Sequence, residues 1–138
     1  MADNRATVEQ FLRAMQANDI EAQERLLADD IVEEYPQSGE IIRGKANRRA
    51  IMENYPGGTP QETSGSSRPE ARLTGAGDDF TAVGAITYPN GETWQVVALI
   101  ELRDGKIRKI TSIFGAPFEA PAWRQPYVER KEDRVRPR

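Results

Sequence analysis

Two tight-turn signals divide the C-terminal half of the sequence and constrain the fold more than any other feature. Asn90-Gly91 and Asp104-Gly105 are residue pairs that accept the positive φ angles of two-residue hairpins. They separate three runs of strand-forming residues, 80–88, 93–103 and 107–114. The pattern therefore predicts three long strands in an antiparallel meander.

The N-terminal half shows helical spacing instead. Val8, Phe11, Leu12 and Met15 recur at i, i+3, i+4 and i+7, which predicts one amphipathic helix. A shorter helix follows, with Asp19 as its candidate cap. The period changes to two over 31–35, and a short strand over 40–43 precedes a third helix over 45–54. We expect a polar loop from residue 61 and a further strand near 70–74.

This order of elements predicts an α+β fold. The expected architecture is a cone: a curved mixed or antiparallel sheet wrapped around three helices from the N-terminal half, with an apolar cavity inside. The length of 138 residues fits one domain, which we place at 1–128. Residues 115–128 are rich in proline and aromatic residues and predict an extended arm, packed on the domain or on a partner subunit. Residues 129–138 form a charged tail that we expect to be flexible.

Composition excludes several kinds of chemistry. The chain contains neither cysteine nor histidine, which removes disulfides, thiolate chemistry and every histidine-dependent triad. We therefore expect no metal and no cofactor. A net charge of −3 gives no electrostatic reason to expect nucleic acid or an anionic membrane as a partner. No apolar run approaches the roughly 20 residues of a membrane span, so we expect a cytoplasmic protein.

The motifs "LLADDIVEEYP", "IRGKA" and "ELRDGKIRKITSIFG", in this order, resemble the nuclear transport factor 2-like fold and its SnoaL-like group over about residues 5 to 115. "ENYPGG" and "FGAPFEAPAWRQPYVE" are similar to an uncharacterised subset of that group. The resemblance implies a cone with an apolar cavity and a homodimer through the outer face of the sheet. It also implies functions that include ketosteroid isomerase, polyketide cyclase, epoxide hydrolase, dehydratase and plain binding.

The catalytic pattern of ketosteroid isomerases is not retained. By that resemblance the general base falls at Tyr35 and the tyrosine donor at Phe11. The protonated aspartate falls at Ala98 or Leu99. Each position has lost its functional group, which argues against steroid isomerisation by that mechanism.

Strand parity singles out Glu33 as the candidate base. If Tyr35 faces the interior, Glu33 does so too, and Glu34 faces outward. A carboxylate in apolar surroundings becomes a better proton acceptor near neutrality, because desolvation disfavours its charged form. We therefore predict Glu33 and Tyr35 as catalytic residues. The alternative is that Glu33 lies near the mouth of the cavity or pairs with an arginine such as Arg48.

The strand over 93–103 is apolar at every even position, so this side should form the cavity wall. Val97 and Leu99, on the other side, are candidates for the homodimer interface. A basic cluster, Arg43, Lys45, Arg48 and Arg49, predicts a solvated, salt-bridged helix face. We expect ligand contacts from seven further residues: Phe11, Met15, Tyr55, Trp94, Val96, Ala98 and Phe114.

Two functions from different classes remain open. The leading one is a lyase, isomerase or hydrolase acting on an apolar small molecule, with a carboxylate base. The alternative is a non-catalytic protein that binds such a molecule.

Overall fold

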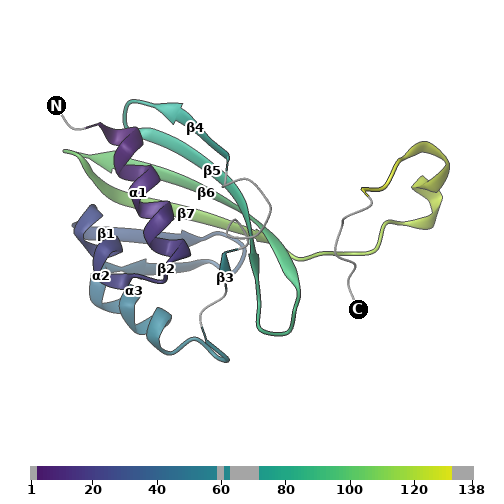
Figure 1. Ribbon diagram of the computed structural model, residues 1–138, viewed down its shortest axis with the longest axis horizontal. Helices are drawn as coiled ribbons and strands as arrows, with labels where there is room; N and C mark the ends of the chain where they lie inside the picture. Colours follow the sequence, from purple (N-terminus) through teal and green to yellow (C-terminus); the bar gives the residue numbers. More distant parts are fainter. Residues whose placement is uncertain (1–2, 59–60, 63–71, 132–138) are drawn as a thin grey trace.

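The computed structural model describes residues 3–58, 61–62 and 72–131 (Figure 1). The chain begins with two helices, α1 (Asn4–Gln16) and α2 (Ile20–Leu26). Asp3 caps α1 by accepting a hydrogen bond from the backbone N–H of Ala6 at 3.1 Å. Asp19 caps α2 in the same way, accepting from Ala22 at 3.0 Å. Val8 and Phe11 are fully buried, as the helical spacing predicts.

A hairpin and a third helix follow. The hairpin consists of β1 (Leu27–Tyr35) and β2 (Glu40–Arg43), and it leads directly into α3 (Gly44–Glu53). β1 starts four residues earlier than the sequence predicts, because Leu27 already pairs with β7. The register shifts between Leu27 and Val32, and this irregularity accommodates the exposed Asp29 and Asp30 within the strand.

The second half forms most of the sheet. Its strands are β3 (Gln61–Glu62), β4 (Arg72–Ala76), β5 (Asp79–Thr87), β6 (Thr93–Arg103) and β7 (Lys106–Gly115). The predicted meander of three long strands is confirmed, since β5 pairs with β6 and β6 with β7, both antiparallel. The predicted loop from residue 61 is wrong for 61–62, which pair with β5. The rest of that loop and the first two residues of the strand predicted at 70–74 lie outside the described residues, and β4 covers the remainder of that strand.

Within the described ranges the strands form one curled, unclosed sheet of seven strands, in the order β2-β1-β7-β6-β5-β3, with β4 paired to β5. β1 runs parallel to β7, so the sheet is mixed. α1 crosses one face of this sheet (Figure 1). Phe11 from α1 packs there with residues such as Ile31, Ile100 and Ile110 from the sheet. The predicted α+β cone is confirmed.

The C-terminal arm projects away from the domain (Figure 1). It contains a short 3-10 helix, η2 (Ala122–Tyr127), so the prediction of an arm extended throughout is wrong there. Proline does not prevent this turn: Pro121 precedes it with an ordinary φ, and short 3-10 turns have few hydrogen bonds to lose at Pro126. Trp123 and Tyr127 are 73% and 82% exposed, so these side chains do not pack on the domain.

Candidate functional site

A cavity of about 480 Å³ opens between the sheet and the helices α1 and α3. Its wall includes all nine predicted site residues, which come from α1, β1, β6, β7 and the loop after α3: Phe11, Met15, Glu33, Tyr35, Tyr55, Trp94, Val96, Ala98 and Phe114. The sheet contributes alternate positions, because successive side chains of a strand point to opposite faces. Their gathering around one cavity makes it the candidate site.

Several further residues line the cavity that sequence reasoning did not assign to it. Tyr88 is one of them, and Met52 and Ser112 are two others. Tyr88 shares its parity with Ala82 and Ile86 of β5, which also line the cavity, so strand alternation could have identified it. Met52 lies on α3, one turn after Arg48, and no sequence signal identified this face of the helix as the one at the cavity.

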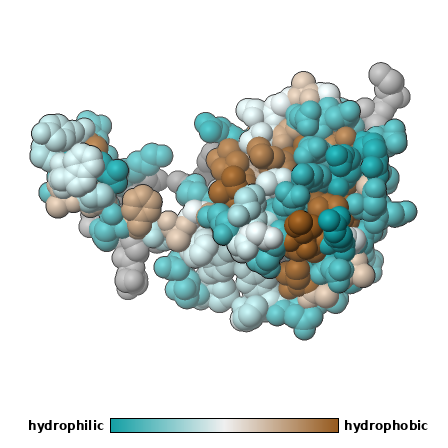
Figure 2. All heavy atoms as spheres, turned by 180° about the vertical axis from the view of Figure 1, so that it is seen from behind, coloured by the Kyte–Doolittle hydropathy of each residue, from teal (hydrophilic) through white to brown (hydrophobic). Residues whose placement is uncertain are grey.

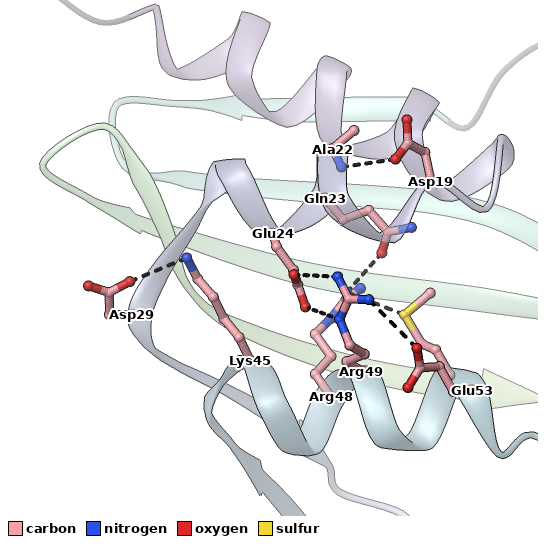
Figure 3. Close-up of polar contacts among 10 residues, drawn as sticks. Asp19, Ala22, Gln23, Glu24, Asp29, Lys45, Arg48, Arg49 and Glu53 are labelled. Atoms are coloured by element: carbon pink, nitrogen blue, oxygen red, sulfur yellow. Dashed lines mark hydrogen bonds and ion pairs between the residues drawn. The ribbon is translucent and has the colours of Figure 1, made fainter.

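Glu33 enters the cavity wall as a buried, paired carboxylate. It is 7% exposed, and its Oε1 accepts a hydrogen bond from Arg48 Nε at 2.6 Å. Arg48 is 6% exposed and also donates from Nη1 to Gln23 Oε1, at 2.8 Å. Figure 3 shows Arg48 reaching from α3 toward Gln23 of α2. The sequence left two alternatives for Glu33, a place in the cavity or a pair with an arginine. The residue does both, because it lines the cavity and pairs with Arg48.

The neighbouring Glu34 points the other way. It lies on the outer face of the sheet, where Lys109 Nζ is 3.5 Å from its Oε1. About a third of its side chain is exposed, whereas Glu33 is nearly inaccessible. Parity thus separates two adjacent glutamates into a site residue and a surface residue.

The basic cluster of α3 divides in the same way. Arg49 makes two hydrogen bonds to Glu24, at 3.0 and 2.7 Å, and Lys45 lies 3.3 Å from Asp29 (Figure 3). The bond from Arg49 lowers the pKa of the Glu24 carboxyl. These contacts fit the predicted salt-bridged surface. The prediction is wrong for Arg48, because Gln23 and Glu33 satisfy its charge inside the domain.

Tyr35 completes the polar part of the cavity. Its hydroxyl donates to Glu33 Oε2 at 3.3 Å, and its ring meets Phe114 edge to face, with centroids 5.4 Å apart. Burial raises the pKa of the Tyr35 hydroxyl well above its ordinary value, and the negative charge of Glu33 raises it further. Tyr35 therefore remains a neutral donor at physiological pH.

A second group of aromatic rings covers another part of the wall. Tyr88 and Trp94 pack edge to face at 5.0 Å, and Tyr55 lies 6.4 Å from Tyr88. Burial raises the pKa of the Tyr88 hydroxyl, with a further contribution from its hydrogen bond to Tyr55. With Phe11, Tyr35 and Phe114, six aromatic side chains line the cavity. Such a lining accepts a flat, apolar molecule.

Among the described residues, no group of three or more acidic side chains could hold a metal ion. No helix in the same part of the chain is long and apolar enough to cross a membrane. The polar side chains of the cavity wall include Glu33, Arg48, Ser112 and the hydroxyls of Tyr35, Tyr55 and Tyr88.

A curled, unclosed sheet that packs on helices around an apolar cavity defines the nuclear transport factor 2-like class of proteins. The family model of the SnoaL-like domain matches residues 8–110, and the chain belongs to this family. Among curated proteins, none matches the chain.

Solved structures of this class superpose on 80% or more of the chain. An NTF-2 like protein of unknown function from Burkholderia xenovorans is 33% identical, covers 93% of this chain and 94% of its own, and has a TM-score of 0.75. A proposed ketosteroid isomerase from Kribbella flavida is 26% identical, with 97% and 93% covered and a TM-score of 0.79. A proposed polyketide cyclase from Xanthomonas campestris is 21% identical over 80% and 88%, with a TM-score of 0.66, and shares the fold.

Proposed function

We propose that the protein binds an apolar, ring-containing small molecule in the cavity. The observation that carries this proposal is the composition of the wall: mostly aromatic and aliphatic side chains surround a space of about 480 Å³, with the buried polar side chains Glu33, Arg48 and Ser112 among them. Sites for small molecules combine a mostly apolar lining with a few polar groups that fix orientation. The names of the Kribbella and Xanthomonas structures, an isomerase and a cyclase, agree with ligands of this kind.

Catalysis by Glu33 is the second candidate function, favoured by the position of this carboxylate in the cavity wall. Its oxygens, however, are engaged by Arg48 at Oε1 and by Tyr35 at Oε2. A carboxylate with both oxygens already hydrogen-bonded must give up one of these bonds to take a substrate proton, and losing the bond to Arg48 would leave that buried charge unpaired. We therefore rank binding ahead of general-base chemistry.

The binding proposal is tested by filling the cavity. Ala98→Phe places a ring inside the wall, whereas Gln95→Phe makes a comparable change on the opposite face of the same strand. A Trp123→Phe background leaves Trp94 as the fluorescent reporter, since the chain has two tryptophans. We expect naphthalene probes to quench Trp94 in the parent and in Gln95→Phe, but not in Ala98→Phe. Equal quenching in all three would place binding elsewhere.

General-base chemistry has its own test. If Glu33 removes a proton next to a carbonyl, the protein should accelerate deuterium exchange at the α-carbon of 2-tetralone in heavy water. Glu33→Gln should abolish that acceleration, while Glu34→Gln should retain it. If 2-tetralone binds and its exchange is not accelerated, general-base chemistry by Glu33 is excluded and binding remains the proposed function.

We further infer a homodimer through the outer face of the sheet. Leu99 and Ile113 are 41% and 42% exposed there, on adjacent strands. Figure 2, the view from behind, shows hydrophobic side chains gathered among hydrophilic ones on this side of the domain. Exposed apolar groups on an antiparallel sheet are typical of a surface that associates.

A further inference from the structure

The polar part of the cavity, which we call the polar pole, consists of the side chains of Glu33, Tyr35 and Arg48. Two of its residues donate hydrogen bonds to the third. The Tyr35 hydroxyl donates to Glu33 Oε2, and Arg48 Nε donates to Glu33 Oε1. These two donors are therefore directed at the carboxylate.

The remaining contacts of Arg48 direct its charge further from a ligand. Nη1 donates to Gln23 Oε1 at 2.8 Å and contacts Met52 Sδ at 3.4 Å. The Phe11 ring covers the guanidinium, with its centroid 5.3 Å from Cζ. Gln23 is itself buried and fixed, because its Nε2 donates to the Ala14 carbonyl oxygen at 3.3 Å. The network holds the guanidinium in place and pairs its positive charge with Glu33.

Beside the N–H groups of Arg48 Nη2, which donate to none of the described residues, the polar pole still offers acceptor capacity. An ionised carboxylate has about four lone-pair sites. Among the described residues, the two hydrogen bonds to Glu33 come from Arg48 and Tyr35. The Tyr35 oxygen also retains lone pairs when its proton is donated. A ligand group that reaches the polar pole gains most if it donates a hydrogen bond.

We propose that the polar pole selects a ligand hydroxyl, of an alcohol or a phenol, over a ketone, an ether or an anion. This inference rests on the proposed binding function and adds the chemical class of the ligand. A ketone or an ether oxygen has no proton to donate to the lone pairs of Glu33 and Tyr35. A carboxylate would meet the charge of Glu33 in a poorly solvated site, where like charges repel strongly.

Four matched naphthalenes separate these classes: 2-naphthol, 2-methoxynaphthalene, 2-acetylnaphthalene and 2-naphthoate. They share one ring system and differ in the group that reaches the polar pole. We expect 2-naphthol to bind roughly 10- to 100-fold more tightly than each of the other three at neutral pH, as a hydrogen bond to a charged acceptor provides. Quenching of Trp94, with Ala98→Phe as the blocked control, gives the dissociation constants.

Each outcome is decisive. Equal affinities for the four probes, all lost in Ala98→Phe, would overturn the selection of a hydroxyl and leave the binding function intact. If 2-naphthoate bound most tightly, Arg48 would bind an anion. If the ketone bound most tightly, the polar pole would donate a hydrogen bond to the ligand. Either result would overturn the proposal. Failure of all four probes to bind would count against the binding function, and the selection would fall with it.

Variants of the polar pole separate the acceptor from the donor. Tyr35→Phe removes the hydroxyl that donates to Oε2 and leaves the ion pair with Arg48 in place. We expect it to retain the preference for 2-naphthol, because Oε2 then gains a free lone pair. Glu33→Gln should lose the preference, and Glu34→Gln, the same change on the outer face, should keep it. Loss of the preference in Tyr35→Phe alone would assign recognition to the tyrosine instead. Circular dichroism confirms that each variant is folded.

Discussion

At the scale of single residues, the ion pair between Glu33 and Arg48 couples the cavity to the stability of the domain. Both side chains are less than a tenth exposed, and they lie 2.6 Å apart. Burial makes each charge depend on the other, since an unpaired charge at this place would lose its hydration without compensation. The Glu33–Arg48 pair therefore contributes to stability through charges that are buried, whereas the pairs on the surface of α3 are partly solvated.

Removing one member of this pair should destabilise the protein strongly. We expect Arg48→Met to lower the free energy of unfolding by about 3–5 kcal/mol, because Glu33 is left buried without a counter-charge. The double variant Glu33→Gln with Arg48→Met should lose less, since no charge remains. Lys109→Met is the control: it removes the partner of the exposed Glu34 and should cost less than about 1 kcal/mol. Urea denaturation measures all three, and a double variant as unstable as Arg48→Met would contradict this account.

Tyr35 should make the protein lose stability at alkaline pH. Its pKa is raised in the folded state by burial and by Glu33, whereas in the unfolded chain it is near its ordinary value of about 10. Above that pH the unfolded chain releases a proton that the folded chain retains, so the free energy of unfolding falls as pH rises. Denaturation between about pH 8 and 11 should show this fall, and Tyr35→Phe should make it shallower. An unchanged slope in the variant would assign the effect elsewhere, for example to Tyr88, whose pKa is also raised.

At the residue scale, some placements in the candidate site can be predicted from the sequence and others cannot. Parity alone places Glu33 inside and Glu34 outside, because a strand offers two faces. The burial of Arg48 is not predictable in the same way. Its neighbours Lys45 and Arg49 are surface residues with similar side chains, and the groups that satisfy Arg48 lie 25 and 15 residues away in the sequence, at Gln23 and Glu33. Such long-range pairing becomes visible only in the folded chain.

At the scale of secondary structure, the elements set by turn signals are those that the sequence predicts well. β6 has the predicted bounds, 93–103, because Asn90-Gly91 and Asp104-Gly105 fix both of its ends. The start of β1 is less predictable, since Asp29 and Asp30 are typical of a turn but here lie within a strand, at the register shift between Leu27 and Val32, which both pair with β7. Partner strands overrule local preference at such positions.

The β4–β5 hairpin depends on glycine at position 75. Gly75 has φ +124°, and a Cβ built there would collide with the Asp79 carbonyl oxygen and lie 2.7 Å from Phe80 Cα. We expect Gly75→Ala to lower the free energy of unfolding by at least about 2 kcal/mol, because backbone atoms cannot move aside cheaply. Gly77→Ala, with φ +65° but no atom within 4 Å, should cost only about 1 kcal/mol. Equal losses in urea denaturation would contradict the steric explanation.

At the scale of the whole molecule, two surfaces expose apolar groups that the domain does not use: the outer face of the sheet and the arm. The arm leaves the end of β7, two residues after Ile113 of the outer face. Gln37 fixes the strand just before this point through two hydrogen bonds with the Phe114 backbone, at 2.5 and 2.7 Å. The arm therefore starts at the border of the proposed dimer interface. This position favours the second of the two predicted arrangements, in which the arm packs on the partner subunit.

The proposed dimer predicts that outer face and arm act together. Stable interfaces bury roughly 1,200–2,000 Å² in total, and a patch centred on Leu99 and Ile113 benefits from the added area of Trp123 and Tyr127. We expect the wild-type protein to sediment as a dimer of 15.5 kDa subunits. Leu99→Lys combined with Ile113→Lys should make it monomeric, and truncation after Gly115 should weaken the dimer. Glu21→Lys, a charge change on α2, should leave the dimer unaffected. A dimer that survives the double lysine variant would exclude this face, and a truncated chain that associates as tightly as the full chain would exclude the arm.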